Sequence, residues 1–116
     1  FQHVDRVGVA DLWLDNEAIE RGGYTTDLIT AEALAFIEKH RDHPFFLYLS
    51  HPAPHFPWQG PQDTDKVVEP KKPSWQQGDR ATYVAMVEHL DTSIGRIMAQ
   101  LARLGLREQT LVVFSS

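Results

Sequence analysis

The chain has 116 residues, of which 42% are hydrophobic, a formal net charge of −5 and no cysteine. This length suits a single domain, and a modestly acidic chain without a basic patch argues against nucleic acid as a partner. The absence of cysteine excludes disulfides and thiolate metal sites within the sequence. No apolar stretch approaches the roughly 20 residues of a membrane span, so no membrane partner is expected.

The two ends predict that the sequence is an internal piece of a larger protein. It begins at Phe1 rather than at a methionine, and it stops inside an apolar strand pattern at 110–116 with no turn after it. On this interpretation, a motif that the chain lacks does not count against an activity of the parent protein. The compartment stays undetermined, because an export signal would precede Phe1.

The first part of the chain predicts a hairpin region over 1–23 and a helix over 24–43. Apolar residues flank Asp15 and Asn16, which tolerate the positive φ of a hairpin turn. Thr25 or Thr26 is expected to cap the helix. Its end near His40 is rich in cations, which complement the helix dipole and are not interpreted as metal ligands.

Residues 44–50 predict a core strand, followed by a long functional loop over 51–79. The strand segment is an unbroken aromatic and aliphatic run that is too short for a helix, so burial on both faces is expected. The loop contains several prolines and glycines and no sustained periodicity, and irregular segments of this length are often functional. Trp58 and Trp75 argue against plain disorder there.

A long amphipathic helix is predicted over 80–105, and a second core strand over 110–116. Strand, loop, helix and strand in this order predict a right-handed crossover between parallel strands, and therefore an α/β fold. His55 and the residues after Ser116 are then expected at one edge of the sheet. The apolar stripe of the helix consists of Tyr83, Val87, Leu90, Ile94, Ile97, Leu101 and Leu104.

Two histidines begin the loop, and the residues alone leave three interpretations open. His51 and His55 could be a metal pair, a general acid/base pair, or loop residues that hydrogen-bond the backbone. No helix aligns them, so nothing makes their ring nitrogens converge on a metal. His55 lies between prolines that restrict its freedom, which makes it the candidate for a functional role.

Five segments, in this order, resemble the middle of a type I sulfatase, and the resemblance covers nearly all of the chain from Tyr24 onward. Each segment is a weak signal by itself, whereas five in the family's order and approximate spacing are specific. The segments are Tyr24-Thr-Thr-Asp27, Pro44-Phe-Phe-Leu-Tyr-Leu-Ser50, Ala53-Pro-His-Phe-Pro57, Tyr83 to Asp91 with Ile94-Gly-Arg96, and Thr110-Leu-Val-Val-Phe-Ser-Ser116.

The resemblance implies a three-layer αβα sandwich of the alkaline-phosphatase-like type and a parent enzyme that hydrolyses sulfate esters. In this family the nucleophile is a formylglycine made from an upstream Cys/Ser-x-Pro-x-Arg motif. One divalent cation, usually calcium, is bound by ligands expected upstream of Phe1 and just after Ser116, and none is expected within the chain. His55 matches the histidine that contacts the sulfate and helps to protonate the leaving oxygen. Asp91 is interpreted as structural.

The same resemblance implies a sulfated small molecule or carbohydrate as the substrate. Members of this family are commonly exported, periplasmic or lysosomal, which is a statement about the family and not about this chain. The isolated piece is expected to be inactive and to self-associate through exposed apolar surface. Two alternatives stay open. One is a phosphoester or phosphonate hydrolase of the same superfamily, and the other is a non-catalytic interaction module that uses the 83–104 helix as a partner face.

Overall fold

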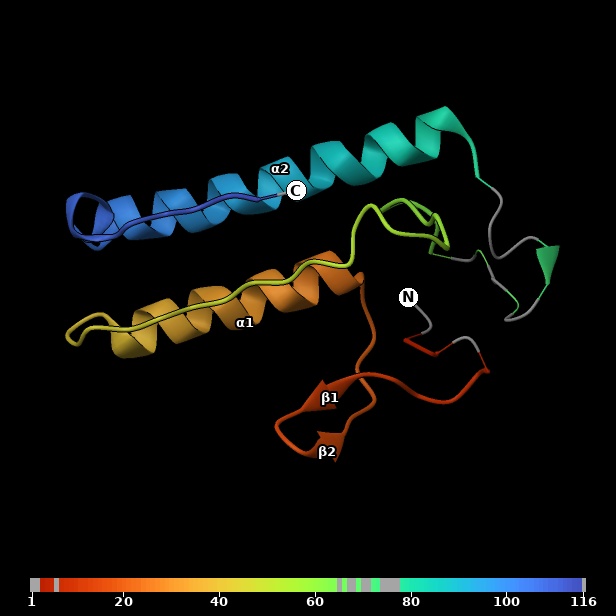
Figure 1. Ribbon diagram of the computed structural model, residues 1–116, viewed down its shortest axis with the longest axis horizontal. Coiled ribbons are helices and arrows are strands. Elements are labelled where there is room, and N and C mark those ends of the chain that lie inside the picture. The colour runs from red at the N-terminus through yellow and green to blue at the C-terminus, as the bar shows by residue number, and fades with distance from the viewer. Residues whose placement is uncertain are drawn as a thin grey trace.

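The structure is a computed structural model, and it describes residues 3–5, 7–64, 66, 69, 72, 73 and 78–115. Its elements in chain order are β1 (Trp13–Leu14), β2 (Glu17–Ala18), α1 (Thr25–His40), α2 (Arg80–Arg103) and the short 3-10 helix η2 (Arg107–Gln109). Figure 1 shows α1 and α2 side by side, running in the same direction. None of the helices in these described ranges is long and apolar enough to span a membrane.

The hairpin forms around the turn that the sequence predicted. β1 and β2 pair antiparallel, with Trp13 opposite Ala18 and Leu14 opposite Glu17. Asp15 has a φ of 54°, a left-handed conformation that Asp and Asn adopt more readily than most residues. The polar turn therefore accounts for the place at which the chain reverses.

The ends of α2 follow from local chemistry. The Asp79 carboxylate accepts a hydrogen bond from the Thr82 backbone nitrogen at 2.8 Å, which satisfies a free donor in the first turn. At the other end Gly105 has a φ of 71°, and its nitrogen donates to the Ala102 carbonyl at 3.0 Å. In contrast, the N-cap residue of α1 is Tyr24, which makes no side-chain cap hydrogen bond, so the predicted Thr25 or Thr26 cap is wrong.

The core lies where α1 packs against α2, and it is small. Ile37 from α1 and Leu101 from α2 are almost fully buried, and buried Thr30 donates to the Thr26 carbonyl at 2.6 Å. The predicted stripe on α2 is only partly covered, because its member Leu101 is buried whereas Tyr83 and Val87 are exposed. Buried hydrophobic residues of the described ranges are Tyr24, Ala33, Ile37, Met86 and Leu101.

Hydrogen bonds and an ion pair between polar side chains join α1 and α2 at two places along their length. Near the start of α1, Asp27 accepts from His89 Nε2 at 3.0 Å. Near its end, Glu38 accepts from Gln100 at 2.8 Å and pairs with Arg103. Both sets of contacts join residues about 62 to 65 positions apart in the sequence, so they hold α1 and α2 in one register.

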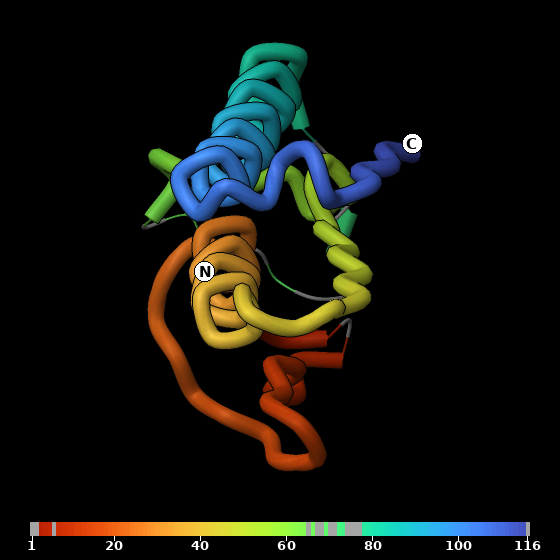
Figure 2. Tube along the Cα trace, turned by 90° about the vertical axis from the view of Figure 1, so that its left-hand side faces the viewer, coloured from red at the N-terminus to blue at the C-terminus, as the bar shows by residue number. Residues whose placement is uncertain are grey.

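The predicted αβα sandwich with parallel core strands is wrong for this chain. The sheet formed by the described residues is the two-stranded antiparallel hairpin β1–β2. Residues 44–50 and 110–115 are extended, and Figures 1 and 2 show each segment returning along its own helix on the same side of the helix pair. Neither segment belongs to a hydrogen-bonded ladder among the described residues, and Ser116 lies outside them.

Burial on both faces, which the aromatic run predicted, is also absent. Phe46 and Tyr48 are 87% and 80% exposed, while Phe45, Leu47 and Leu49, which alternate with them, are half-buried. The alternation is that of an extended segment with one covered face. The Cα radius of gyration of 15.8 Å exceeds the roughly 13 Å of a compact domain of this size, in keeping with these open faces.

Candidate active site

The predicted site residue His55 lies on an exposed turn that follows the extended segment 44–50. Its backbone nitrogen donates to the Pro52 carbonyl at 2.8 Å, which closes the turn. The peptide bonds that precede Pro54 and Pro57 are both cis. The imidazole of His55 stacks on the Phe56 ring with centroids 4.6 Å apart, and the histidine as a whole is exposed.

The ring of His55 is oriented by a hydrogen bond to its neighbour. Its Nδ1 lies 2.6 Å from the Phe56 carbonyl oxygen. A carbonyl can only accept, so Nδ1 carries the hydrogen and Nε2 is the nitrogen available to a ligand. This arrangement lets Nε2 accept a proton in the neutral ring and donate one in the charged ring, which is what a general acid next to an anionic substrate requires.

The turn that carries His55 is held by Trp58. The indole Nε1 donates to the Pro54 carbonyl at 3.0 Å, one residue before the histidine. The indole itself lies against Tyr83 of α2, with ring centroids 5.3 Å apart. Gly78 passes directly over the ring, because a Cβ at that position would lie 2.2 Å from Trp58 Cε3. The space for the indole thus depends on the absence of a side chain at Gly78.

A second bond ties the same loop to the helix pair. The Tyr24 hydroxyl donates to the Gln59 carbonyl at 2.9 Å, and burial raises the pKa of Tyr24 above its ordinary value of 10.0. The Tyr24 ring meets His89 edge to face at 5.3 Å. His89 in turn donates to Asp27, which also pairs with Arg96 at 3.5 Å. The position of the loop is therefore linked to the contact between α1 and α2.

The stretch after Trp58 folds back on itself. Lys66 Nζ donates to the Trp58 carbonyl at 3.2 Å, and the Gln59 amide donates to the Lys66 carbonyl at 2.6 Å. Asp63 accepts from the buried Gly60 nitrogen at 2.9 Å. These bonds satisfy polar groups of the described loop residues, which belong to no helix or strand.

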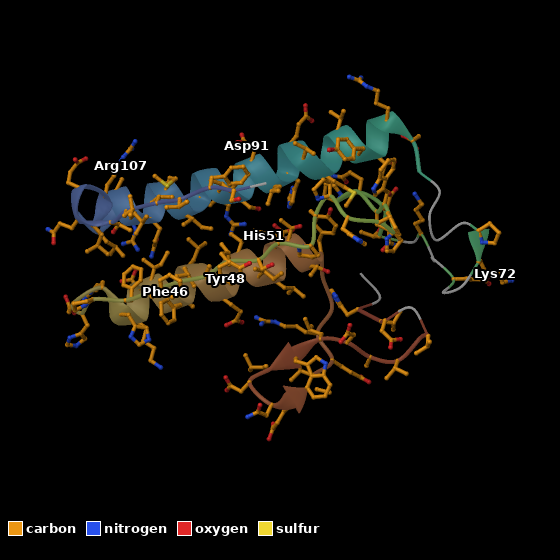
Figure 3. The ribbon with its side chains drawn as sticks, in the orientation of Figure 1. Phe46, Tyr48, His51, Lys72, Asp91 and Arg107 are labelled. Carbon is orange, nitrogen blue, oxygen red and sulfur yellow. The ribbon has the colours of Figure 1, made fainter. Side chains whose placement is uncertain are left out.

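His51 lies at the end of the extended segment, as Figure 3 shows, and its ring is in a different situation from that of His55. Both ring nitrogens are buried without a hydrogen-bond partner in the described part of the chain. Burial lowers the pKa of His51 below its ordinary value of 6.5, because desolvation disfavours the charged ring. No hydrogen bond among the described residues joins His51 to His55, so the two histidines are not brought together as an acid/base pair.

The described residues do not fit a metal site by themselves. Within residues 3–5, 7–64, 66, 69, 72, 73 and 78–115, no three His, Asp or Glu side chains gather closely enough to hold an ion. A divalent cation needs several such ligands. Asp91 is exposed on α2, in keeping with its interpretation as a residue outside the chemistry (Figure 3).

An apolar groove of about 350 Å³ lies on another part of the molecule. It is formed between the hairpin, α1 and the extended segment, with Trp13, Phe36 and Leu47 among its lining. No residue of the His55 loop lines it. The groove is therefore not the place where a substrate would meet His55.

His55 stays a predicted site residue, and the residues that hold its turn are not evident from the sequence. In the sequence, Trp58 argues only against disorder, and Tyr24 is only part of a motif. A usable signal was present, since tryptophan and tyrosine usually place their N–H and O–H on a partner when the ring is partly buried. The sequence does not show which carbonyls they reach.

Comparison with known proteins gives the family. The sulfatase family model matches residues 2–116, which is nearly the whole chain. The chain is 32% identical over 107 residues to YdeN, an uncharacterized sulfatase of Escherichia coli (strain K12), with 90% of this chain and 19% of that protein covered. It is 36% identical over 92 residues to the human N-acetylgalactosamine-6-sulfatase, with 78% of this chain and 16% of that protein covered. No solved structure matches the chain significantly.

The chain belongs to the sulfatase family, because the family model covers it almost from end to end. A further relative, the N-acetylgalactosamine-6-O-sulfatase of Bacteroides thetaiotaomicron, is 30% identical over 109 residues, which are 94% of this chain and 18% of that protein. The chain thus spans less than a fifth of the length of these three relatives. It corresponds to one part of a sulfatase sequence.

Proposed function

We propose that the protein containing this chain hydrolyses a sulfate ester to an alcohol and inorganic sulfate. The observation that carries the proposal is the match of the sulfatase family model to residues 2–116. The turn at 52–57 supports it, because His55 is exposed there with Nε2 available to an anionic ligand. The substrate class is a sulfated small molecule or carbohydrate.

In this proposal His55 contacts the sulfate ester and supplies a proton. As a nucleophile from outside the described residues forms its bond to sulfur and the bond between sulfur and the ester oxygen breaks, the proton on Nε2 passes to the departing oxygen and leaves the ring neutral. The Phe56 carbonyl stays hydrogen-bonded to Nδ1 in both states of the ring, so the ring does not have to turn during the transfer. A pre-oriented donor avoids the cost of reorganisation at the moment of reaction.

The nucleophile and the cation fall outside the described residues. Formylglycine and calcium follow from the family resemblance alone, and the described residues supply neither a cysteine nor a metal-binding cluster. The role proposed for this chain is accordingly limited to His55 and the loop that carries it, and the chain by itself is proposed to be inactive.

Turnover of two matched esters by the full-length protein tests the reaction class. Hydrolysis of para-nitrophenyl sulfate at least tenfold faster than para-nitrophenyl phosphate, compared as kcat/KM, is the result expected of a sulfatase. The opposite preference would favour the phosphoester hydrolase. Turnover of neither ester, in a protein whose circular dichroism shows that it is folded, would favour the non-catalytic module.

A further inference from the structure

Two backbone carbonyls of the loop that presents His55 accept hydrogen bonds from aromatic side chains, one within the loop and one at the start of α1. Pro54, immediately before the histidine, accepts from the Trp58 indole at 3.0 Å. Gln59, four residues after the histidine, accepts from the Tyr24 hydroxyl at 2.9 Å. The exposed turn therefore has one side-chain donor on each side of it.

Each donor is itself fixed by packing. The Trp58 ring lies beside Tyr83 of α2 and under Gly78, where a Cβ would clash with the ring at 2.2 Å. Tyr24 is 8% exposed and meets His89 of α2 edge to face. Both donors thus come from groups that the helix pair holds in place, and a rotamer locked by packing is what positions a neighbouring group within a few tenths of an ångström.

We propose that Trp58 and Tyr24 are positioning residues for His55: their hydrogen bonds to the Pro54 and Gln59 carbonyls hold the turn so that Nε2 meets the leaving oxygen. This inference rests on the proposed sulfate ester hydrolysis. Trp58 and Tyr24 do not touch the reacting atoms, and each acts on His55 through the backbone of the turn. Loss of either bond loosens the turn and lowers the fraction of bound substrate that is correctly oriented.

The consequence is a loss in kcat with little change in KM. A neutral hydrogen bond contributes on the order of 1 kcal/mol, so removal of one of the two bonds is expected to lower kcat by about five- to tenfold. The binding of sulfate by groups elsewhere is unaffected, so KM stays within about twofold. A merely structural role would lower the melting temperature and the yield of active enzyme instead.

The experiment uses the full-length enzyme and para-nitrophenyl sulfate, with the variants Trp58→Phe, Tyr24→Phe and His55→Ala. Each aromatic substitution removes the hydrogen-bonding N–H or O–H and keeps a ring. The matched control is Trp13→Phe, because the Trp13 indole also donates a hydrogen bond, to Asp11 at 3.2 Å, but it lies in the hairpin far from the loop in sequence. Melting temperatures are measured for all variants.

The double variants Trp58→Phe/His55→Ala and Tyr24→Phe/His55→Ala decide whether the two residues act through His55. The expected result is that each aromatic substitution lowers kcat in the wild type, that neither lowers it further in His55→Ala, and that Trp13→Phe has no effect. Wild-type kcat in both aromatic variants, or the same further loss on the His55→Ala background, overturns this inference alone. If Trp58→Phe does not fold, the same comparison with Tyr24→Phe and Tyr24→Phe/His55→Ala tests the inference. No turnover of the sulfate by the unaltered enzyme overturns the proposed function and this inference with it.

Discussion

At the scale of single residues, two histidines four positions apart have opposite surroundings. His55 is exposed with one ring nitrogen on a carbonyl, whereas both nitrogens of His51 are buried without a partner in the described ranges. The difference follows from the alternation of the extended segment, which turns His51 to the covered side after Phe45, Leu47 and Leu49. Spacing in the sequence could not distinguish them.

His51 is expected to make the chain sensitive to acid. Burial lowers the pKa of His51 in the folded state, so the unfolded chain binds the proton first as the pH falls below the ordinary value of 6.5. Above that value both states are neutral at this residue and it contributes no pH dependence. The free energy of unfolding should therefore fall between pH 7 and pH 5, and His51→Phe should reduce that fall.

Urea unfolding at a series of pH values measures this effect. His43→Phe is the control, because His43 is exposed. An acid-induced loss of stability that is the same in His51→Phe and in the unaltered chain would contradict the interpretation. The partly buried His3, whose pKa is also lowered mainly by burial, accounts for any smaller slope left in the variant.

At the scale of elements, the cap of α2 is the feature that the local sequence explains most completely. Asp79 accepts from both the backbone nitrogen and the hydroxyl of Thr82, and these bonds lower the pKa of its carboxyl. Asp79→Ala should lower the melting temperature, and acidification through the carboxyl range should do the same in the unaltered chain. Asp91→Ala, in the exposed middle of α2, should leave the melting temperature unchanged, and equal effects of the two substitutions would argue against capping.

The contact between the helices carries most of the burial, so a substitution there should be costly. Leu101 is 3% exposed, and Leu101→Ala is expected to lower the free energy of unfolding by about 2–5 kcal/mol. Leu111→Ala is the matched control, because Leu111 is 90% exposed and an exposed substitution changes stability by about 0.5 kcal/mol or less. Denaturant unfolding of both variants gives the comparison, and similar losses would mean that the core lies elsewhere.

The elements that periodicity and turn chemistry define were predictable, and those that need a distant partner were not. The helix over 80–105 and the turn at Asp15 and Asn16 rest on local signals, namely a cap, a C-terminal glycine and a tolerated positive φ. A strand is formed by a hydrogen-bonded neighbour, which no property of 44–50 can supply. The prediction of a buried, paired strand at 44–50 is therefore wrong, although the segment is extended.

The same reasoning applies to the candidate site. The prolines around His55 predict an irregular loop, and the chain does turn there, with the His55 nitrogen bonded to the Pro52 carbonyl. The two donors that hold it, Trp58 and Tyr24, reach carbonyls four and thirty-five residues away, according to the hydrogen bonds they make. The longer of these contacts depends on how the loop packs on α1 and α2, which local sequence does not specify.

At the scale of the whole molecule, the most exposed of the large apolar side chains in the described ranges lie on the two extended segments. Phe46, Tyr48, Leu111 and Val113 are each at least 78% exposed, and both segments lie on the same side of the helix pair (Figure 2). Exposed apolar surface of this kind, beside unpaired backbone, promotes association. The isolated chain should therefore sediment as oligomers whose share rises with concentration.

Sedimentation velocity of a Phe46→Lys/Leu111→Lys variant tests that origin of association. Charges on these exposed positions should shift the chain towards the monomer without loss of helix content, because neither side chain belongs to the core. The control is Val7→Lys, a 53% exposed apolar position outside the two segments. Association that is unchanged in the double variant would place the contact on another surface.

The central claim is that His55, on the turn at 52–57, takes part in sulfate ester hydrolysis by the sulfatase that contains this chain. The most direct measurement is kcat/KM of the full-length enzyme on para-nitrophenyl sulfate for the unaltered protein, His55→Ala and the exposed control His43→Ala. We expect a loss of about a hundredfold or more for His55→Ala, the usual range for a general acid, and no change for His43→Ala. A His55→Ala enzyme that keeps kcat/KM within about twofold of the unaltered protein would contradict this claim.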